Sequence, residues 1–229
     1  MKVLSIDVGI KNLSYVFIDI ESLSDNKWKI LDWNNINILH NLDDLDYIAN
    51  EYKKWSKLIL QECATKLSIF YEKKETKENL QTKIKLFLKE KKIKKSGINL
   101  QKIVKNIEKH FKSIFVTNKC DVVLIENQPC LKNPQMKTMQ IIIFTYFCLL
   151  ESNYKVKFIS ASEKLKYCVK AGLLDEIPKK DYKKTKKKSI DIVSKLIKGY
   201  EPDMWVMSKK KDDLSDVLLQ AFAYCDKVT

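Results

Sequence analysis

The chain has 229 residues, of which 45% are hydrophobic and 31% charged, so it is long enough to bury a full core and its composition excludes wholesale disorder. Its 43 basic residues outnumber 29 acidic ones for a net charge of +14, and every basic residue is a lysine. An AT-rich genome is one explanation for the lysine bias, but the excess of bases over acids favours a polyanionic partner. Because arginine makes the bidentate contact to guanine best, a lysine-only chain favours recognition of backbone and shape.

Membrane and zinc-binding classes are disfavoured by the same composition. Met1 leads directly into a strand-like segment instead of a signal peptide, and the longest apolar run, residues 141–150, is about half of a bilayer span. The six cysteines form no CxxC pair, and the chain has only two histidines. We therefore expect a soluble, intracellular protein with buried thiols, no structural zinc and no membrane partner.

The first segments predict three antiparallel strands. Residues 3–6 are a short apolar strand that delivers Asp7, and residues 13–20 alternate in a way typical of a strand that returns across the turn at 9–12. A third strand-like run covers residues 28–39.

The next segments are helical in pattern. Residues 45–70 have apolar side chains at mixed three and four spacing, and residues 99–115 are amphipathic. Between them, residues 71–95 are dense in Lys and Glu, which predicts a solvated helix or a mobile insertion, with a boundary at Ser96-Gly97.

From residue 121 onward, strands alternate with helices. Residues 121–126 are typical of a central strand, and residues 155–160 predict another, followed by a short helix capped by Ser160 or Ser162. The predicted helices include residues 135–151, a helix after the lysine run at 179–188 with Ile190, Val193 and Ile197 facing the core, and a last helix that begins near Asp212. The class is therefore α/β with a mixed sheet.

Acidic residues stand at the ends of two predicted strands and in the first turns of the last helix. If the first and fourth strands are parallel neighbours, Asp7 and Glu126 emerge at the same sheet edge, where ligand sites tend to lie. Asp213 and Asp216 are spaced i,i+3 on one helix face, but Asp212 and Asp216 at i,i+4 also share a face, so spacing leaves the choice open. Each acid taken alone could instead have a purely structural role, as a turn residue, a helix cap or a charge that complements the helix dipole.

A cluster of carboxylates repels itself unless a cation holds it. Oxygen ligands without histidine favour Mg²⁺, with Mn²⁺ as a substitute, and two such ions can activate water and stabilise the leaving oxygen of a phosphodiester. The pattern thus predicts a metal-dependent nuclease.

Four segments resemble the motifs of the poxvirus-type Holliday junction resolvases, a RuvC-like branch of the ribonuclease-H-like superfamily with relatives in other large DNA viruses. They are SIDVGIKN (5–12), VVLIENQP (122–129), YKKTKKKSIDI (182–192) and KKKDDLSDVLLQ (209–220). The resemblance implies a ribonuclease-H-like mixed sheet flanked by helices, as a single nuclease domain over residues 1–229 with a Lys/Glu-rich helical insertion at about 45–97.

Membership would imply a Mg²⁺-dependent homodimer that resolves four-way DNA junctions by paired symmetric nicks, acting in DNA recombination and repair. A viral protein of this kind would work at the site of viral DNA replication in the host cell. The resemblance assigns the metal ligands to Asp7, Glu126, Asp213 and Asp216, and prefers Asp213 over Asp212.

The family motif also supplies a basic residue near the scissile phosphate. Helical spacing back from Ile190 places Lys186 and Lys187 at the edge of the packed face, and we favour Lys187, with Lys186 second. The bland alternative is a solvated surface. The candidate phosphate contacts are Lys11, Lys183, Lys184, Lys186 and Lys188.

The helix at residues 135–151 is apolar almost all round and must be covered on every side. The insertion or a second subunit could cover it, and paired nicks favour the second subunit.

Other functions compete with junction resolution. An actin-like or Hsp70-like ATPase needs more glycine-rich phosphate loops than a chain with four glycines offers. A ribonuclease-H-like nuclease acting on an RNA–DNA hybrid or other branched DNA would use the same carboxylates, and a non-catalytic DNA-binding module would not need all of them.

Overall fold

The computed structural model describes residues 1–39, 44–93, 99–115, 119–131, 133–150, 153–177 and 182–228. The chain forms two compact units. One consists of Met1–Ile38 with Val104–Thr229, and the other of Leu39–Ile103.

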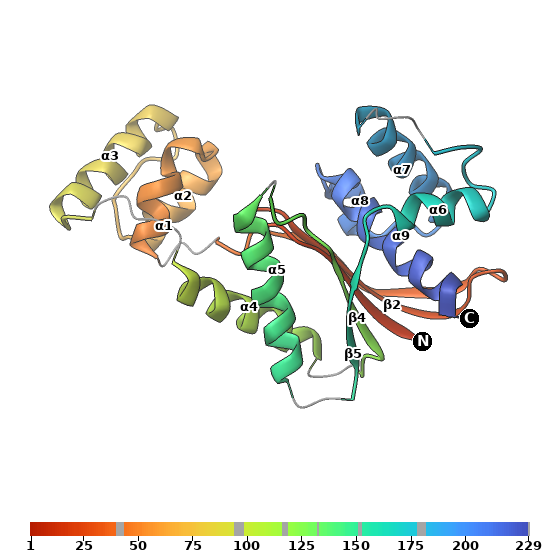
Figure 1. Ribbon diagram of the computed structural model, residues 1–229. Helices are drawn as coiled ribbons and strands as arrows, with labels where there is room; N and C mark the ends of the chain where they lie inside the picture. The colour runs from red at the N-terminus through yellow and green to blue at the C-terminus, as the bar shows by residue number, and fades with distance from the viewer. Residues whose placement is uncertain are drawn as a thin grey trace. The chain divides into compact units, whose positions relative to one another are not determined.

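The strands of the described residues form a five-stranded mixed sheet in the order β3-β2-β1-β4-β5 (Figure 1). The strands are β1 (Lys2–Asp7), β2 (Leu13–Ser22), β3 (Lys27–Ile36), β4 (Val122–Glu126) and β5 (Lys155–Ile159). Strands β1, β2 and β3 pair antiparallel, whereas β4 pairs parallel with both β1 and β5. The three-stranded antiparallel start and the parallel pairing of the first and fourth strands are confirmed, and β3 ends at Ile36 instead of extending to residue 39.

Gly9 lies in the turn that follows β1, and the backbone closes on it. A Cβ atom at Gly9 would lie 2.1 Å from the carbonyl oxygen of Asn12. The obstructing oxygen belongs to the backbone and cannot move aside as a flexible side chain could, so only glycine fits the turn that links Asp7 to β2.

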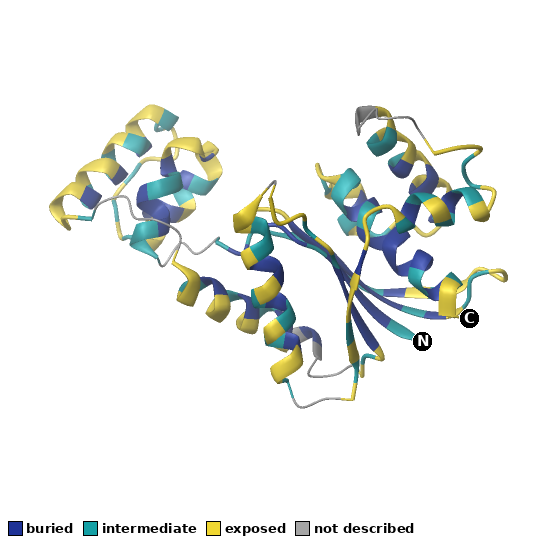
Figure 2. Ribbon diagram, viewed as in Figure 1, coloured by how far each residue is buried: buried dark blue, intermediate teal, exposed yellow. Residues whose placement is uncertain are grey.

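Helices cover both faces of the sheet. On one face lies α9 (Lys211–Val228), accompanied by α6 (Glu163–Lys170), α7 (Tyr182–Leu196) and α8 (Asp203–Met207). Alternate residues of β2, such as Val16 and Ile18, enter the core beneath α9, which is the dark blue layer in Figure 2.

The opposite face is covered by α4 (Leu100–Phe115) and α5 (Pro134–Leu149). Tyr15 of β2 meets the ring of Phe111 at 5.7 Å between centroids, and Phe111 meets Phe147 of α5 at 5.2 Å. Edge-to-face aromatic packing therefore joins the sheet, α4 and α5.

The second unit has a core of its own. It comprises α1 (Leu45–Glu51), a 3-10 turn η1 (Tyr52–Lys54), α2 (Lys57–Lys66) and α3 (Lys77–Glu90). Asp44, Ser56 and Thr76 cap the three α-helices through side-chain acceptors.

Sequence reasoning underestimated α3, because its apolar residues are few. Leu80, Ile84 and Leu88 are all buried, and their i,i+4,i+8 spacing places them on a single stripe. The expected boundary at Ser96-Gly97 lies outside the described residues. That this unit is an insertion into one nuclease domain stays a prediction.

Candidate active site

Helix α9 carries the acidic pair on its first turns. The helix packs across β1 and β2, and Gln220 donates a hydrogen bond to the Ile6 carbonyl at 3.4 Å, one residue before Asp7. The side chains of Asp213 and Asp216 are 14% and 15% exposed, so both carboxylates are largely withdrawn from water. An apolar helix face thus brings an acidic end against the end of β1.

Asp7 and Glu126 lie at the ends of neighbouring parallel strands. In the register, Ile6 pairs with Ile125, so the two acids follow side by side at the same edge. Burial, and then the charges of Glu126 and Asp216, raise the pKa of Asp7 well above its usual value. Burial likewise raises the pKa of Glu126, although Lys164 opposes it. Asp7, Glu126 and Asp216 are therefore close enough for their charges to raise one another's cost of ionisation.

Lys164 of α6 is a buried lysine within this acidic cluster, and sequence reasoning missed it. Its ammonium lies 2.7 Å from the Asp216 carboxylate and 3.7 Å from that of Glu126. Burial opposes the charge of Lys164, but Asp216 and Glu126 outweigh it and raise the lysine pKa. Nothing in the sequence distinguishes this lysine from its neighbours except its place in the first turn of α6, the helix that follows the strand paired with Glu126.

A second lysine meets the other acids of α9. The ammonium of Lys186 on α7 contacts Asp212, and it lies 3.2 Å from Oδ1 of Asp213. Burial raises the pKa of Asp212, but Lys186 outweighs it and lowers that pKa overall. Burial and the neighbouring Asp212 charge raise the pKa of Asp213. The Lys186 ammonium thus contacts both of the aspartates that spacing alone could not tell apart, and the preference for Asp213 as a metal ligand stays a prediction.

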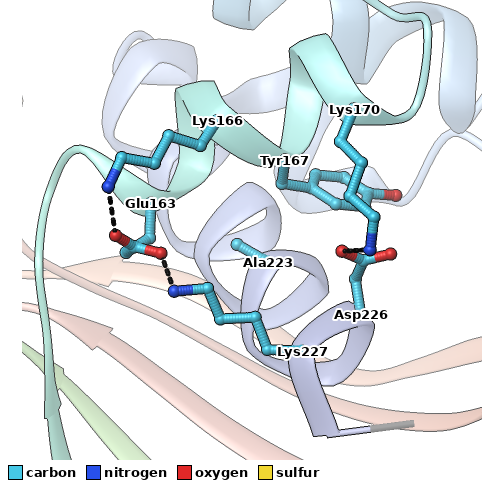
Figure 3. Close-up of a pocket in the computed structure, with 7 residues that line it drawn as sticks. All are labelled: Glu163, Lys166, Tyr167, Lys170, Ala223, Asp226 and Lys227. Atoms are coloured by element: carbon cyan, nitrogen blue, oxygen red, sulfur yellow. Dashed lines mark hydrogen bonds and ion pairs between the residues drawn. The ribbon is translucent and has the colours of Figure 1, made fainter.

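Ion pairs beside the cluster hold α6 against α9. Figure 3 shows a shallow pocket between these helices, in which Glu163 contacts Lys227 and Lys170 lies 2.7 Å from Asp226. Glu163 precedes Lys164 in sequence. These pairs join α6 and α9 beside the contact between Lys164 and Asp216.

The loop after Glu126 is tied to α5. The side-chain oxygen of Gln140 accepts from the Gln128 backbone at 2.9 Å and from Lys137 at 3.1 Å. Lys137 also donates to the Asn127 side chain at 3.1 Å. Gln140 is fully buried, so this network gives the exit of β4 a fixed path.

The remaining predicted lysines are not among the buried acids. The side chains of Lys11, Lys184, Lys187 and Lys188 are exposed, whereas Lys186 is half-buried. Residues 179–181 and the Lys183 side chain lie outside the described part of the structure. Val193 and Ile197 are buried and Ile190 packs against them, so the predicted core face of α7 is confirmed. Lys186, and not the favoured Lys187, contacts the α9 acids.

The four predicted carboxylates are the kind of ligand that a hard cation such as Mg²⁺ prefers. Asp7, Glu126, Asp213 and Asp216 provide only oxygen ligands, and burial of their like charges leaves a demand for positive charge. Among the described residues, no group of three or more His, Cys, Asp or Glu side chains converges closely enough to hold a metal ion as placed. The ammonium groups of Lys164 and Lys186 instead lie on these acids.

A mixed sheet in this order, with acids at the ends of β1 and β4 and on the helix that crosses them, defines the ribonuclease-H-like class of folds. Profiles of two families match the chain: "Mitochondrial resolvase Ydc2 / RNA splicing MRS1" over residues 3–130, and "Poxvirus A22 protein" over residues 75–227. Each match covers more than half of the chain. The chain therefore belongs to the resolvase families that these two models describe.

One curated viral protein is also similar in sequence. The uncharacterized protein L451 of Acanthamoeba polyphaga mimivirus is 32% identical over 142 residues, which are 56% of this chain and 33% of the relative. The match therefore spans about a third of the relative's length.

Two solved structures share the fold. The fowlpox virus Holliday junction resolvase has a TM-score of 0.52 at 16% identity, over all of both chains. Thermus thermophilus RuvC has a TM-score of 0.55 at 12% identity, over 100% of this chain and 98% of RuvC. At these identities the likeness concerns the fold alone. Among the described helices, none has the length and apolar character needed to cross a bilayer.

Proposed function

We propose that this chain is a Mg²⁺-dependent endonuclease that resolves four-way DNA junctions by paired symmetric nicks. The observation that carries the proposal is the cluster of buried acids at the shared end of β1, β4 and α9, which repel one another and lie against two lysines. Membership of the resolvase families supports phosphodiester cleavage in branched DNA as the chemistry of this cluster.

Asp7, Glu126, Asp213 and Asp216 would hold the metal. When bound, Mg²⁺ would supply an activated water and neutralise charge on the phosphate, with Mn²⁺ able to substitute. The protein's own part is to bury and orient these carboxylates. Strands β1 and β4 fix Asp7 and Glu126 through their backbones, and α9 fixes the other two on one helical turn.

The lysines in and around the cluster have two roles: one compensates the buried acids, and the others can contact DNA phosphates. Lys164 compensates Glu126 and Asp216 from inside the protein, at 3.7 and 2.7 Å. Lys186 lies at the border between the acids and the exposed lysines of α7, where it can meet a phosphate oxygen. Lys11, Lys184, Lys187 and Lys188 are exposed, a position suited to phosphates beyond the cleavage site.

We further propose that two copies of the chain form the working enzyme, because paired nicks need two active sites. Helix α5 supports this proposal with an outward stripe at three and four spacing: Thr138, Ile141, Thr145, Cys148 and Leu149, all of them exposed. Leu149 is 76% exposed and Ile141 45% exposed. The stripe is mixed, with two threonines, but exposed apolar side chains such as Ile141 and Leu149 are typical of a protein interface.

The decisive experiment offers the purified protein three labelled substrates with Mg²⁺: a four-way junction, a linear duplex and an RNA–DNA hybrid. We expect cleavage of the junction at symmetric positions in opposite strands, and no cleavage in EDTA. Asp7→Asn and Asp213→Asn should each abolish cleavage while junction binding stays nearly unchanged.

The alternatives predict other patterns. Cleavage of the hybrid alone would replace the junction with an RNA-containing substrate. Junction binding without cleavage, under any divalent ion, would make the chain a binding module. Full cleavage by both Asn variants would overturn the ligand assignment.

A further inference from the structure

Asp212 is an acidic residue that the proposed metal site does not use. It precedes Asp213 at the start of α9, and its side chain is 20% exposed. Its partner is the ammonium of Lys186, which also lies 3.2 Å from Asp213. One lysine of α7 is thus shared by two consecutive aspartates of α9.

The two aspartates have different neighbours. Asp213 is one of the four proposed metal ligands, and it lies three residues before Asp216, whose carboxylate shares the Lys164 ammonium with Glu126. A cation bound by Asp213 would repel the ammonium of Lys186 from that carboxylate. Asp212 is then the carboxylate on which Lys186 can remain.

We propose that Asp212 is a positioning residue, which keeps the Lys186 ammonium beside Asp213 so that it can meet a DNA phosphate there. The inference rests on the proposed nuclease function and adds to it a residue that acts only through Lys186. It also assigns the phosphate-facing base of α7 to Lys186.

The competing account is local. Asp212 lies in the first turn of α9, where a negative charge complements the helix dipole whatever α7 carries. In that case the effect of removing Asp212 would be the same whether or not Lys186 is present. The two accounts therefore differ in whether the two substitutions are additive.

The test is a cycle of Asp212→Asn, Lys186→Ala and the double variant, measured as single-turnover junction cleavage at saturating Mg²⁺. We expect each single substitution to slow cleavage about tenfold or more, as for the loss of one fixed charge near a reacting phosphate. The double variant should be no slower than Lys186→Ala, and Asp212→Glu should restore most of the rate. Lys195→Ala, an exposed lysine of the same helix, and Asp203→Asn, an exposed acid in the first turn of α8, should match the wild type.

A second measurement does not depend on cleavage. In ¹⁵N-lysine NMR spectra with Mg²⁺, an ammonium held by a carboxylate gives a signal that exchanges slowly with water. The signal assigned to Lys186, by its absence from Lys186→Ala, should persist in the wild type and Asp212→Glu and vanish in Asp212→Asn.

Persistence of that signal in Asp212→Asn would overturn the inference, as would a full additional loss of rate from Asp212→Asn in the Lys186→Ala background. Failure of the wild type to cut junctions would instead remove the proposed function, and the NMR result would still decide whether Asp212 holds Lys186.

Discussion

The indole Nε1 of Trp33 donates a hydrogen bond to the backbone carbonyl of Leu214, 3.2 Å away. Trp33 belongs to β3, and Leu214 lies on α9 between Asp213 and Asp216. The Trp33 ring also stacks on Trp205 of α8 at 5.3 Å, and the ammonium of Lys211 lies 5.4 Å from the centre of the Trp205 ring. The edge strand β3 therefore contacts α9 in the turn that carries Asp213 and Asp216.

Trp33→Phe should lower both stability and cleavage. Loss of the buried hydrogen bond costs about 1 kcal/mol of unfolding free energy, and the smaller ring leaves a gap against Trp205. The rate of junction cleavage should fall several-fold, because Asp213 and Asp216 lose their support. Urea denaturation and single-turnover cleavage measure the two effects. Trp28→Phe is the control, since Trp28 packs on Phe222, further along α9, and should lower stability without changing the rate.

Lys164→Met should destabilise the metal-free protein strongly. The substitution keeps the length of the side chain but leaves Glu126 and Asp216 buried without their cation, which costs about 3 kcal/mol. Mg²⁺ should restore more stability to this variant than to the wild type, because it supplies the missing charge. Thermal unfolding with and without Mg²⁺ tests this.

The control is Lys170→Met, which removes the ion pair with Asp226 seen in Figure 3. Lys170 is 67% exposed, so this substitution should cost at most about 1 kcal/mol. Equal losses in both variants would contradict the role given to Lys164.

Asp7→Asn should stabilise the metal-free protein in a pH-dependent manner. Burial, followed by Glu126 and Asp216, raises the pKa of Asp7 above 3.8, so the folded state prefers the protonated acid. The stability that this proton brings is complete below the unfolded pKa and is lost as pH rises through the folded pKa. The advantage of Asp7→Asn in EDTA should therefore grow as pH rises from 5 to 8. Chemical denaturation at several pH values measures it, and an advantage independent of pH would count against a raised pKa.

His110→Phe should remove a loss of stability at acidic pH. Burial lowers the pKa of His110 below its ordinary 6.5, and the ring packs on Tyr15 at 5.4 Å between centroids. The unfolded state then takes up a proton more readily, so the wild type loses stability as pH falls through about 6.5 towards the folded pKa. The difference between variant and wild type should move in favour of phenylalanine between pH 7.5 and 5. Denaturation curves at matched ionic strength test this, and parallel pH profiles would exclude the effect.

The parts of the fold and site that sequence predicts are those fixed by local pattern. Apolar runs that end in an acid located β1 and β4 and therefore placed Asp7 and Glu126, because parallel neighbours share an edge. The start of α9 was predicted from acids that precede a run of apolar residues at helical spacing. Lys164 was not predicted, because its burial follows from the packing of α6 on α9. One lysine among many has no local signature.

The second unit and the choice among the α7 lysines show the same limit. Leu80, Ile84 and Leu88 are too few to reveal a buried stripe among so many charges, and their burial depends on α1 and α2. Helical spacing placed both Lys186 and Lys187 near the edge of the packed face. Contact with Asp212 and Asp213 on a different helix distinguishes them.

Ile6 pairs with Ile125, which places Asp7 and Glu126 at the same level of the sheet. The site is therefore sensitive to whether an odd or an even number of residues is inserted into or deleted from β4. Side chains of a strand alternate between faces, so deleting one residue within β4 would turn Glu126 towards the opposite helical layer. Deleting two residues would return the carboxylate to the correct face, displaced along the strand by about 7 Å. The spacing from Val122 to Glu126 is therefore confined to a single length if Glu126 is to stay beside Asp7.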